Sequence, residues 1–150
     1  FKSVTKINTD SRNRYLSRIE SKIKLGSTIC LWGLSFKPDT DDIREAPSVY
    51  IIKSLLSKGY KLNVYDPASQ DNIKKIFHSQ LNYFNDQYTA LEGCDALCIL
   101  TEWNQFEEAD FDKMKKGLKN NIIFDGRNIY DPKKMKELGF NYYCVGRKTL

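Results

Sequence analysis

The sequence predicts an α/β fold: a Rossmann-like three-layer sandwich with a mostly parallel sheet of about six strands, preceded by a long helix. Two observations support it. Short apolar runs alternate with helix-like segments along the chain, and the connections between them are short. Two of these runs, 96–100 and 122–124, are continuously apolar, as expected of strands buried on both faces. This alternation is typical of a parallel sheet with helices on both sides.

Start and stop signals place the individual elements. The first helix, over about 4–25, has apolar residues at mostly helical spacing and ends near Gly26. The second begins at Pro47, a residue favoured in the first helical turn, and ends at Gly59. The apolar positions of the first helix are Val4, Ile7, Leu16, Ile19 and Ile23. We expect strands at 28–34, 61–65, 81–84, 96–100, 122–124 and 142–145, and further helices at 69–77, 88–92, 111–118 and 132–138.

Length and charge limit the possible functions. A chain of 150 residues fits one domain. Its net charge is +5, but the lysines are scattered over expected helix surfaces and form no basic block interleaved with aromatics, so we expect no nucleic-acid partner. No apolar run approaches the roughly 18 residues of a membrane span, so we expect no membrane partner. The chain opens with Phe1 and has no leader-like segment, so we expect it to be a piece of a longer protein.

The cysteines favour a structural role. Cys30, Cys98 and Cys144 lie in apolar strand segments, and Cys94 is separated from Cys98 by three residues, not the two of the common zinc knuckle. We predict buried free thiols, a reducing compartment and therefore the cytoplasm. His78 is the only histidine and has no ligand partners nearby in sequence, so we expect no metal site and no histidine-based catalysis.

The loop over 33–48, between the first strand and the second helix, is the first candidate site. Ligands of open α/β sheets bind outside the carboxyl ends of the strands. Pro38 favours an extended Lys37, whose ammonium can pair with a phosphate. The neighbouring Phe36 can cover a base or a ribose, and Arg44 can give two parallel hydrogen bonds to a second phosphate.

The acidic residues of this loop have two interpretations. Asp39, Asp41 and Asp42 could hold a hard cation through their carboxylates. We favour the alternative, in which they cap turns and pair with Lys37 and Arg44 to stabilise the loop.

A second polar cluster follows the strand at 122–124. Gly126 allows a sharp turn, and Arg127 would then project from the same edge of the sheet as Lys37. Two cations at one crevice suit a diphosphate; the alternative is two unrelated surface charges. Trp103, after the strand at 96–100, is interpreted as a packing residue rather than a ligand contact.

The usual signs of a dinucleotide site and of catalysis are missing. Only Gly33 stands where a Gly-x-Gly-x-x-Gly motif would follow the first strand. Asp66, at the position of a ribose-binding acid, is therefore interpreted as a turn residue before Pro67. The sequence contains no recognisable nucleophile–base pair, Ser/His/Asp set or metal cluster. By its chemistry alone, the chain is predicted to be a binding domain.

Three sequence blocks carry a resemblance to a known family. Gly33–Ser48 (GLSFKPDTDDIREAPS), Thr101–Trp103 (TEW) and Phe124–Pro132 (FDGRNIYDP) resemble the C-terminal domain of the UDP-glucose/GDP-mannose dehydrogenases, the later two most closely the members that act on UDP-glucose. The resemblance implies that residues 1–26 are the end of the central connecting helix and residues 27–150 the UDP-sugar-binding domain. The N-terminal NAD-binding and catalytic domain would be absent from this chain.

The resemblance also implies an activity for the full-length protein. Members of the family oxidise UDP-glucose to UDP-glucuronate in two successive NAD-dependent hydride transfers through a thiohemiacetal on a cysteine. Matched by motif, Phe36, Lys37 and Arg127 would contact the UDP-sugar, and Arg44 would reach the phosphates of NAD held mainly by the other domain. The full-length protein would be a homodimer or higher homo-oligomer.

The sequence also departs from the family pattern. The glycine-rich NAD motif and the Gly-Gly-x-Cys-Phe catalytic segment are absent, and no cysteine matches the nucleophile, so we assign no catalytic residue and expect the chain alone to be inactive. Two alternatives stay open: the same domain of a dehydrogenase for another nucleotide sugar, such as UDP-N-acetylmannosamine or GDP-mannose, and a stand-alone, non-catalytic nucleotide-binding module.

Overall fold

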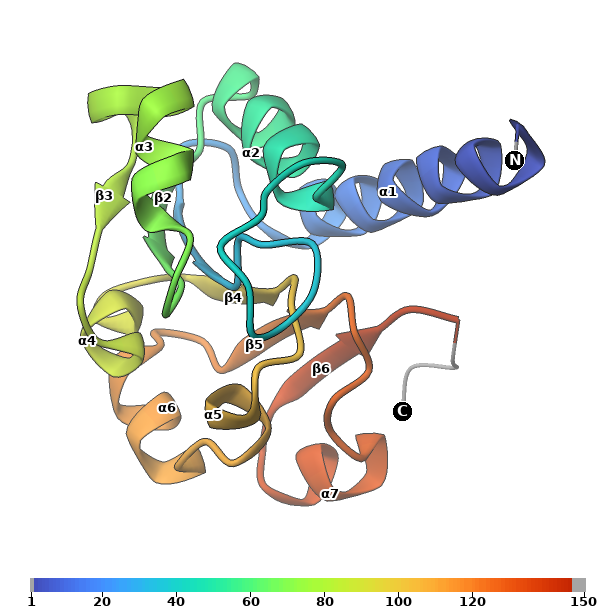
Figure 1. Ribbon diagram of the computed structural model, residues 1–150. Coiled ribbons are helices and arrows are strands. Elements are labelled where there is room, and N and C mark those ends of the chain that lie inside the picture. The colour runs from blue at the N-terminus through green and yellow to red at the C-terminus, as the bar shows by residue number, and fades with distance from the viewer. Residues whose placement is uncertain (1, 147–150) are drawn as a thin grey trace.

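The sheet is the centre of the molecule, and all of its strands are parallel. The computed structural model describes residues 2–146, with side chains from residue 9 onward. The strand order is β3-β2-β1-β4-β5-β6, so the chain reverses its direction of sheet growth between β1 and β4 (Figure 1). The strands are β1 (Thr28–Trp32), β2 (Lys61–Tyr65), β3 (Asn82–Tyr83), β4 (Ala96–Ile99), β5 (Ile122–Asp125) and β6 (Asn141–Cys144). The predicted Rossmann-like sheet of six strands is confirmed.

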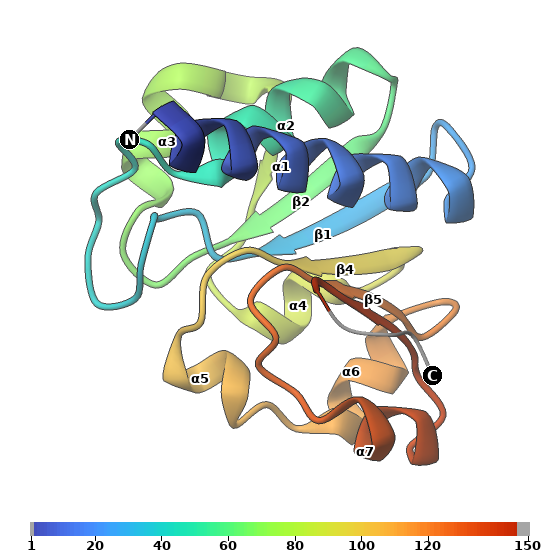
Figure 2. The ribbon, with the colours of Figure 1, turned by 90° about the vertical axis from the view of Figure 1, so that its right-hand side faces the viewer.

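Helices cover both faces of the sheet. Figure 2 shows α1, α2 and α3 on one side and α4 to α7 on the other. The helices are α1 (Lys2–Lys22), α2 (Pro47–Ser57), α3 (Gln70–Phe77), α4 (Gln87–Leu91), α5 (Asn104–Glu107), α6 (Phe111–Gly117) and α7 (Pro132–Glu137), and a 3₁₀ turn, His78–Gln80, follows α3. The three layers follow from the apolar strands, which need a cover on each face.

The two faces of the sheet form two separate apolar clusters. In β1 the side chains alternate: Ile29 and Leu31 pack toward α1 and α2, whereas Cys30 and Trp32 pack toward α4 and α5. Trp32 stacks on Phe106, with ring centroids 5.0 Å apart. The side chains of α1 that join the first cluster are Leu16, Ile19 and Ile23. The predicted apolar face of the first helix is therefore confirmed for these three, while Val4 and Ile7 lie outside the side chains that the structure describes.

Most element boundaries match the prediction to within a few residues, with two differences that have physical causes. β1 ends at Trp32 rather than at residue 34, because Gly33 has a φ of 94° and turns the chain out of the strand. α5 was not predicted. It is a single turn after Trp103, and no side chain caps its N-terminus, so the sequence carries no start signal for it.

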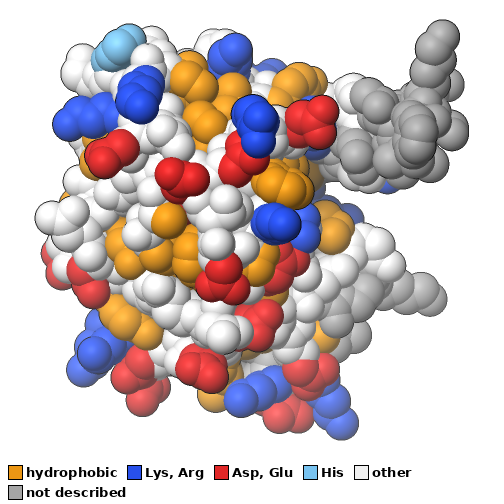
Figure 3. Space-filling model, in the orientation of Figure 1, with side chains coloured by type: hydrophobic (Ala, Val, Ile, Leu, Met, Phe, Trp, Pro, Cys, Tyr) orange, Lys and Arg blue, Asp and Glu red, His pale blue; other side chains and the backbone are white. Residues whose placement is uncertain are grey.

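The predicted buried free thiols are confirmed. All four cysteines are free and buried. On the face shown in Figure 3, Lys and Arg side chains are interspersed with Asp and Glu side chains. Within residues 2–146, no helix combines the length and the hydropathy needed to cross a bilayer.

Candidate functional site

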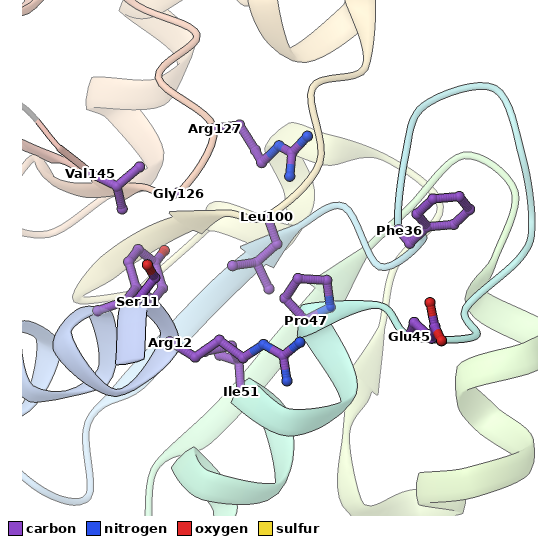
Figure 4. A pocket seen from close by; sticks show the side chains of 11 residues that line it. Ser11, Arg12, Phe36, Glu45, Pro47, Ile51, Leu100, Gly126, Arg127 and Val145 are labelled. Atoms are coloured by element: carbon purple, nitrogen blue, oxygen red, sulfur yellow. The ribbon is translucent and has the colours of Figure 1, made fainter. Parts of the chain in front are cut away.

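A cavity of about 400 Å³ lies at the carboxyl edge of the sheet, where the strand order reverses (Figure 4). This is the position at which open α/β sheets bind ligands. Its walls come from α1, from the loop after β1, from the start of α2 and from the segments after β4, β5 and β6. The lining residues are Ser11, Arg12, Tyr15, Phe36, Glu45, Pro47, Ile51, Leu100, Gly126, Arg127 and Val145.

The loop between β1 and α2 starts from a fixed base. A Cβ on Gly33 would lie 2.6 Å from the Cβ of Thr101 and 2.7 Å from its backbone nitrogen, so only glycine fits here. Thr101 in turn donates a hydrogen bond of 2.7 Å from Oγ1 to the carbonyl of Ser35. The start of the loop is therefore held against the end of β4.

Asp66 holds the same loop from the neighbouring strand. Its carboxylate is buried; Oδ2 accepts from the backbone N–H of Leu34 at 2.7 Å, and Oδ1 accepts from those of Ala68 and Ser69 at 2.8 Å each. The interpretation of Asp66 as a turn residue is confirmed, and it also anchors the loop after β1. Both oxygens are engaged by backbone donors, which does not fit the role of a ribose-binding acid.

Phe36 and Lys37 diverge at the tip of the loop. Phe36 lines the cavity and is 39% exposed. Lys37 does not line the cavity; it is exposed, and its ammonium lies 5.4 Å from the centroid of the Phe36 ring. Among the described residues Lys37 makes no ion pair with a carboxylate, so the expected pairing of the aspartates does not extend to Lys37.

Arg44 does pair with an aspartate of the loop. Its Nη2 lies 2.8 Å from Oδ2 of Asp42, and its Nε donates to Oδ1 at 3.0 Å. These hydrogen bonds lower the pKa of Asp42 to about 2. The interpretation of the acidic residues as loop-stabilising is confirmed for Asp42. Arg44 itself borders a different groove, between the loop and α3, and not the cavity lined by Phe36 and Arg127.

The segment after β5 is organised by a second buried aspartate. Oδ1 of Asp125 accepts from the backbone N–H of Arg127 at 2.8 Å, and Oδ2 accepts from that of Ile129 at 2.8 Å and from the Tyr142 hydroxyl at 2.5 Å. Burial, together with the charge of Asp125, raises the pKa of Tyr142 far above its ordinary value, so its hydroxyl stays a donor. This network aims the turn at Gly126 toward the cavity.

Arg127 is oriented by Glu102. Its Nε and Nη2 donate to Oε2 of Glu102 at 2.9 and 2.5 Å, while Oε1 of Glu102 is buried and has no hydrogen-bond partner among the described residues. Sequence reasoning missed this pair, because nothing in the sequence links two residues from different strand ends. Trp103, next to Glu102, is partly buried against the cluster under α4 to α7, which confirms its packing role.

The structure therefore brings two of the four predicted site residues, Phe36 and Arg127, to one cavity. Sequence reasoning also missed the contribution of α1, whose lining residues are Ser11, Arg12 and Tyr15. Tyr15 donates a hydrogen bond of 2.6 Å to the carbonyl of Phe124, which fixes α1 across the end of β5. The apolar spacing of α1 shows which face packs, but it cannot show which loop the helix crosses.

Comparison with known proteins assigns the domain. Residues 30–132 match the UDP-binding domain of the UDP-glucose/GDP-mannose dehydrogenase family. The chain is 41% identical over 127 residues to the UDP-glucose 6-dehydrogenase of Pseudomonas aeruginosa, and the match covers 81% of this chain and 28% of that protein. It is 35% identical over 151 residues to the UDP-glucose 6-dehydrogenase of Rickettsia conorii, covering 98% of this chain and 35% of the relative.

A solved structure of the same family has a similar fold. The UDP-glucose dehydrogenase of the hyperthermophilic archaeon Pyrobaculum islandicum superposes with a TM-score of 0.79 at 26% identity, over 95% of this chain and 31% of that one. The chain thus spans about a third of the length of its relatives. It belongs to the UDP-glucose/GDP-mannose dehydrogenase family and carries the UDP-binding domain of that family.

Proposed function

We propose that this chain binds UDP-glucose on behalf of a full-length NAD-dependent UDP-glucose 6-dehydrogenase. The reaction of that enzyme would convert UDP-glucose, two NAD⁺ and water into UDP-glucuronate and two NADH. The observation that carries the proposal is that Phe36 and Arg127, matched to the family by motif, border one cavity at the switch point of the sheet. The names of the two relatives at 41% and 35% identity support the choice of sugar nucleotide.

The cavity has the composition that a nucleotide sugar requires. Its volume of about 400 Å³ lies within the range of small-molecule sites. Leu100, Pro47 and Ile51 give it an apolar floor, and Phe36 offers an exposed ring at its mouth. Arg127 supplies a guanidinium that can turn from Glu102 to an anionic or hydroxyl-bearing ligand. We assign Phe36 and Arg127 to the UDP-sugar.

Lys37 and Arg44 receive more peripheral roles in this proposal. Lys37, which is exposed beside Phe36, would meet the UDP-sugar where the ligand leaves the cavity. Arg44 borders a separate groove and is exposed, and we assign it to a phosphate of NAD held by the N-terminal domain. Residues 1–26 would be the end of the connecting helix and residues 27–150 the substrate-binding domain.

This chain by itself provides neither the usual features of an NAD site nor a cysteine placed to act as the catalytic nucleophile. Asp66 is engaged by backbone donors, and the glycine-rich motif after β1 is absent. All four cysteines are buried, and none of them lines the cavity. NAD, when bound in the full-length protein, would accept the hydrides. We therefore expect no NADH from UDP-glucose and NAD⁺ with this chain alone, and NADH production above the background without protein would refute this assignment.

Calorimetric titration of the chain with UDP, UDP-glucose and GDP tests the binding proposal. We expect UDP and UDP-glucose to bind and GDP to bind more weakly. Equal heats with all three nucleotides would indicate attraction of anions by a basic protein, and the proposed function would fail.

Variants of the full-length protein test the site residues. Lys37→Ala and Arg127→Ala should each weaken UDP-glucose binding by about 1–3 kcal/mol, the range for losing a charged hydrogen-bond partner. Arg44→Ala should instead weaken NAD binding. Unchanged Kd and KM for UDP-glucose in the first two variants, or an unchanged affinity for NAD in the third, would remove those residues from the site.

A further inference from the structure

Arg12, in α1, is a cationic side chain that lines the cavity but lies outside the three sequence blocks that resemble the family. It lies outside residues 30–132, the part of the chain that matches the family's UDP-binding domain. Figure 4 shows its guanidinium beside Pro47, on the other side of Leu100 from Arg127. The side chain is half-buried, and its Nε is buried without a hydrogen-bond partner among the described residues. A buried donor of a charged group without an acceptor is costly, so this geometry favours an acceptor brought by a ligand.

The position of Arg12 is set by α2. The Cζ atom lies 5.6 Å from the centroid of the Tyr50 ring, and the Tyr50 hydroxyl donates to Oδ1 of Asn13 at 2.7 Å. The guanidinium is thus stacked rather than neutralised: within the described side chains, no carboxylate forms an ion pair with Arg12. Arg127, in contrast, is already paired with Glu102.

The N-terminus of α2 adds partial positive charge next to Arg12. Its N-cap, Ala46, provides no capping side chain, and the first turn of the helix contains no acidic residue. The first N–H groups of an uncapped helix, together with the helix dipole, favour an anion. Pro47, in that first turn, and Tyr50, one turn later, both face Arg12.

We propose that Arg12 and the N-terminus of α2 together bind a phosphate of the nucleotide diphosphate. This inference rests on the proposed function and makes it more specific: the diphosphate lies between α1 and α2, while Phe36 from the loop after β1 and Arg127 from the loop after β5 contact the rest of the UDP-sugar. Because Arg12 comes from α1, the site needs the helix that precedes the matched domain as well as the domain itself.

The test is calorimetric titration of the 150-residue chain with UDP and with uridine. Arg12→Gln should weaken UDP binding by about ten- to a hundredfold, the loss of one charged hydrogen-bond partner, and should change uridine binding less than twofold. Arg12→Lys should recover part of the loss, because an ammonium keeps the charge but not the planar fork. Arg14→Gln is the matched control: it removes the same charge two residues away, from an exposed side chain that does not line this cavity.

A second variant covers the case in which Arg12→Gln does not fold. Ala46→Asp places a carboxylate at the N-cap, where it would occupy the first N–H groups of α2 and repel a phosphate. It should weaken UDP binding about tenfold or more while leaving uridine binding within twofold, and Ala46→Ser should have a smaller effect because its cap is neutral.

The possible outcomes separate the inference from the proposed function. Loss of UDP affinity in Arg12→Gln and Ala46→Asp, with Arg14→Gln unaffected, supports the phosphate site. Equal losses in Arg12→Gln and Arg14→Gln, or equal losses for UDP and uridine, would overturn it. If Arg127→Gln weakens UDP binding and Arg12→Gln does not, only the inference fails. If the unaltered chain does not bind UDP, the proposed function fails with it.

Discussion

The two loops that border the cavity, after β1 and after β5, are held in place in different ways. Each leaves its strand at a tightly packed glycine, Gly33 or Gly126, and each is held by a buried aspartate. In the loop after β5, the anchor Asp125 holds the backbone of Arg127 directly, and Glu102 orients the side chain. In the loop after β1, the anchor Asp66 holds only the base, at Leu34 and Ser35.

The tip of the longer loop is held mainly by contacts within the loop, together with a hydrogen bond of 2.8 Å from Nδ2 of Asn72 in α3 to the carbonyl of Asp41. The backbone N–H of Phe36 donates to the carbonyl of Asp42 at 3.2 Å, and Asp42 pairs with Arg44. Asp39 and Glu45 have φ values of 63° and 60°, and Asn128 in the loop after β5 has a φ of 56°, so each loop contains a residue in the left-handed region. The comparison indicates one wall, carrying Arg127, that a buried aspartate and Glu102 hold directly, and one wall, carrying Phe36 and Lys37, that a buried aspartate holds only at its base.

Gly33→Ala should have the largest effect on stability. The new Cβ would meet the Cβ and the backbone nitrogen of Thr101, and the φ of 94° is unfavourable for alanine. Adding the strain to the overpacking, we expect a loss of about 4 kcal/mol in the free energy of unfolding, measured by urea denaturation. Gly126→Ala is the matched variant: its Cβ would approach the Ile99 carbonyl at 3.1 Å and the Tyr15 ring at 3.6 Å, which is ordinary van der Waals contact, and its φ is not positive.

For Gly126→Ala we expect a loss of about 1 kcal/mol, since the backbone can shift by a few tenths of an ångström. Equal losses for the two variants would contradict the contrast between the two glycines. A small loss for Gly33→Ala would show that the base of the longer loop can move away from Thr101.

The two aspartates give the second test. Asp125→Ala removes the acceptor of two backbone N–H groups and of the Tyr142 hydroxyl, all in a buried network, and should lower the free energy of unfolding by about 3–4 kcal/mol. Asp66→Ala leaves backbone donors on two loops unpaired and should cost about 2–3 kcal/mol. Both would be measured by urea denaturation.

Tyr142→Phe is the control for this pair. It removes one hydrogen bond from Asp125 and should cost about 1 kcal/mol. The comparison also predicts different effects on binding: among folded molecules, Asp125→Ala should weaken UDP binding more than Asp66→Ala. The reverse order would mean that the loop after β1 is the more important wall of the site.

The sequence predicted the fold because local signals agreed with each other. Continuous apolar strands such as 96–100, helix starts such as Pro47 and stops such as Gly59 each specify an element through its own residues. The same holds for Asp66, whose turn is encoded by the following proline, although its hydrogen bond to Leu34 in another loop is not.

The site was predicted only in part, because it depends on contacts between distant segments. Phe36 and Arg127 could be placed at one edge of the sheet, since parallel strands bring their carboxyl ends together. The Glu102–Arg127 pair joins the ends of two different strands, and Arg12 reaches the cavity because α1 crosses α2. No periodicity or turn signal reports which residue of a helix meets a particular loop.

Arg44→Gln should have the smallest effect on stability and a clear effect on the pKa of Asp42. The pKa of Asp42 is lowered to about 2, mainly by its side-chain hydrogen bonds to Arg44, so loss of those bonds should return it toward its ordinary value near 3.8. Because the folded-state pKa is the lower one, the stabilisation from this pair is fully present above the ordinary pKa of the carboxyl. It is lost as the pH falls through about 2.

The pKa of Asp42 would be measured by NMR from the pH dependence of its carboxyl carbon, in the unaltered chain and in Arg44→Gln. Lys37→Gln is the matched control, because it removes the same charge from the same loop without a hydrogen bond to Asp42 and should raise the pKa much less. At neutral pH, where the carboxyl is ionised in both proteins, the melting temperature of Arg44→Gln should be nearly unchanged, as for other exposed ion pairs. A large fall in melting temperature would mean that the contacts at the tip of this loop contribute as much to stability as those of the loop that carries Arg127.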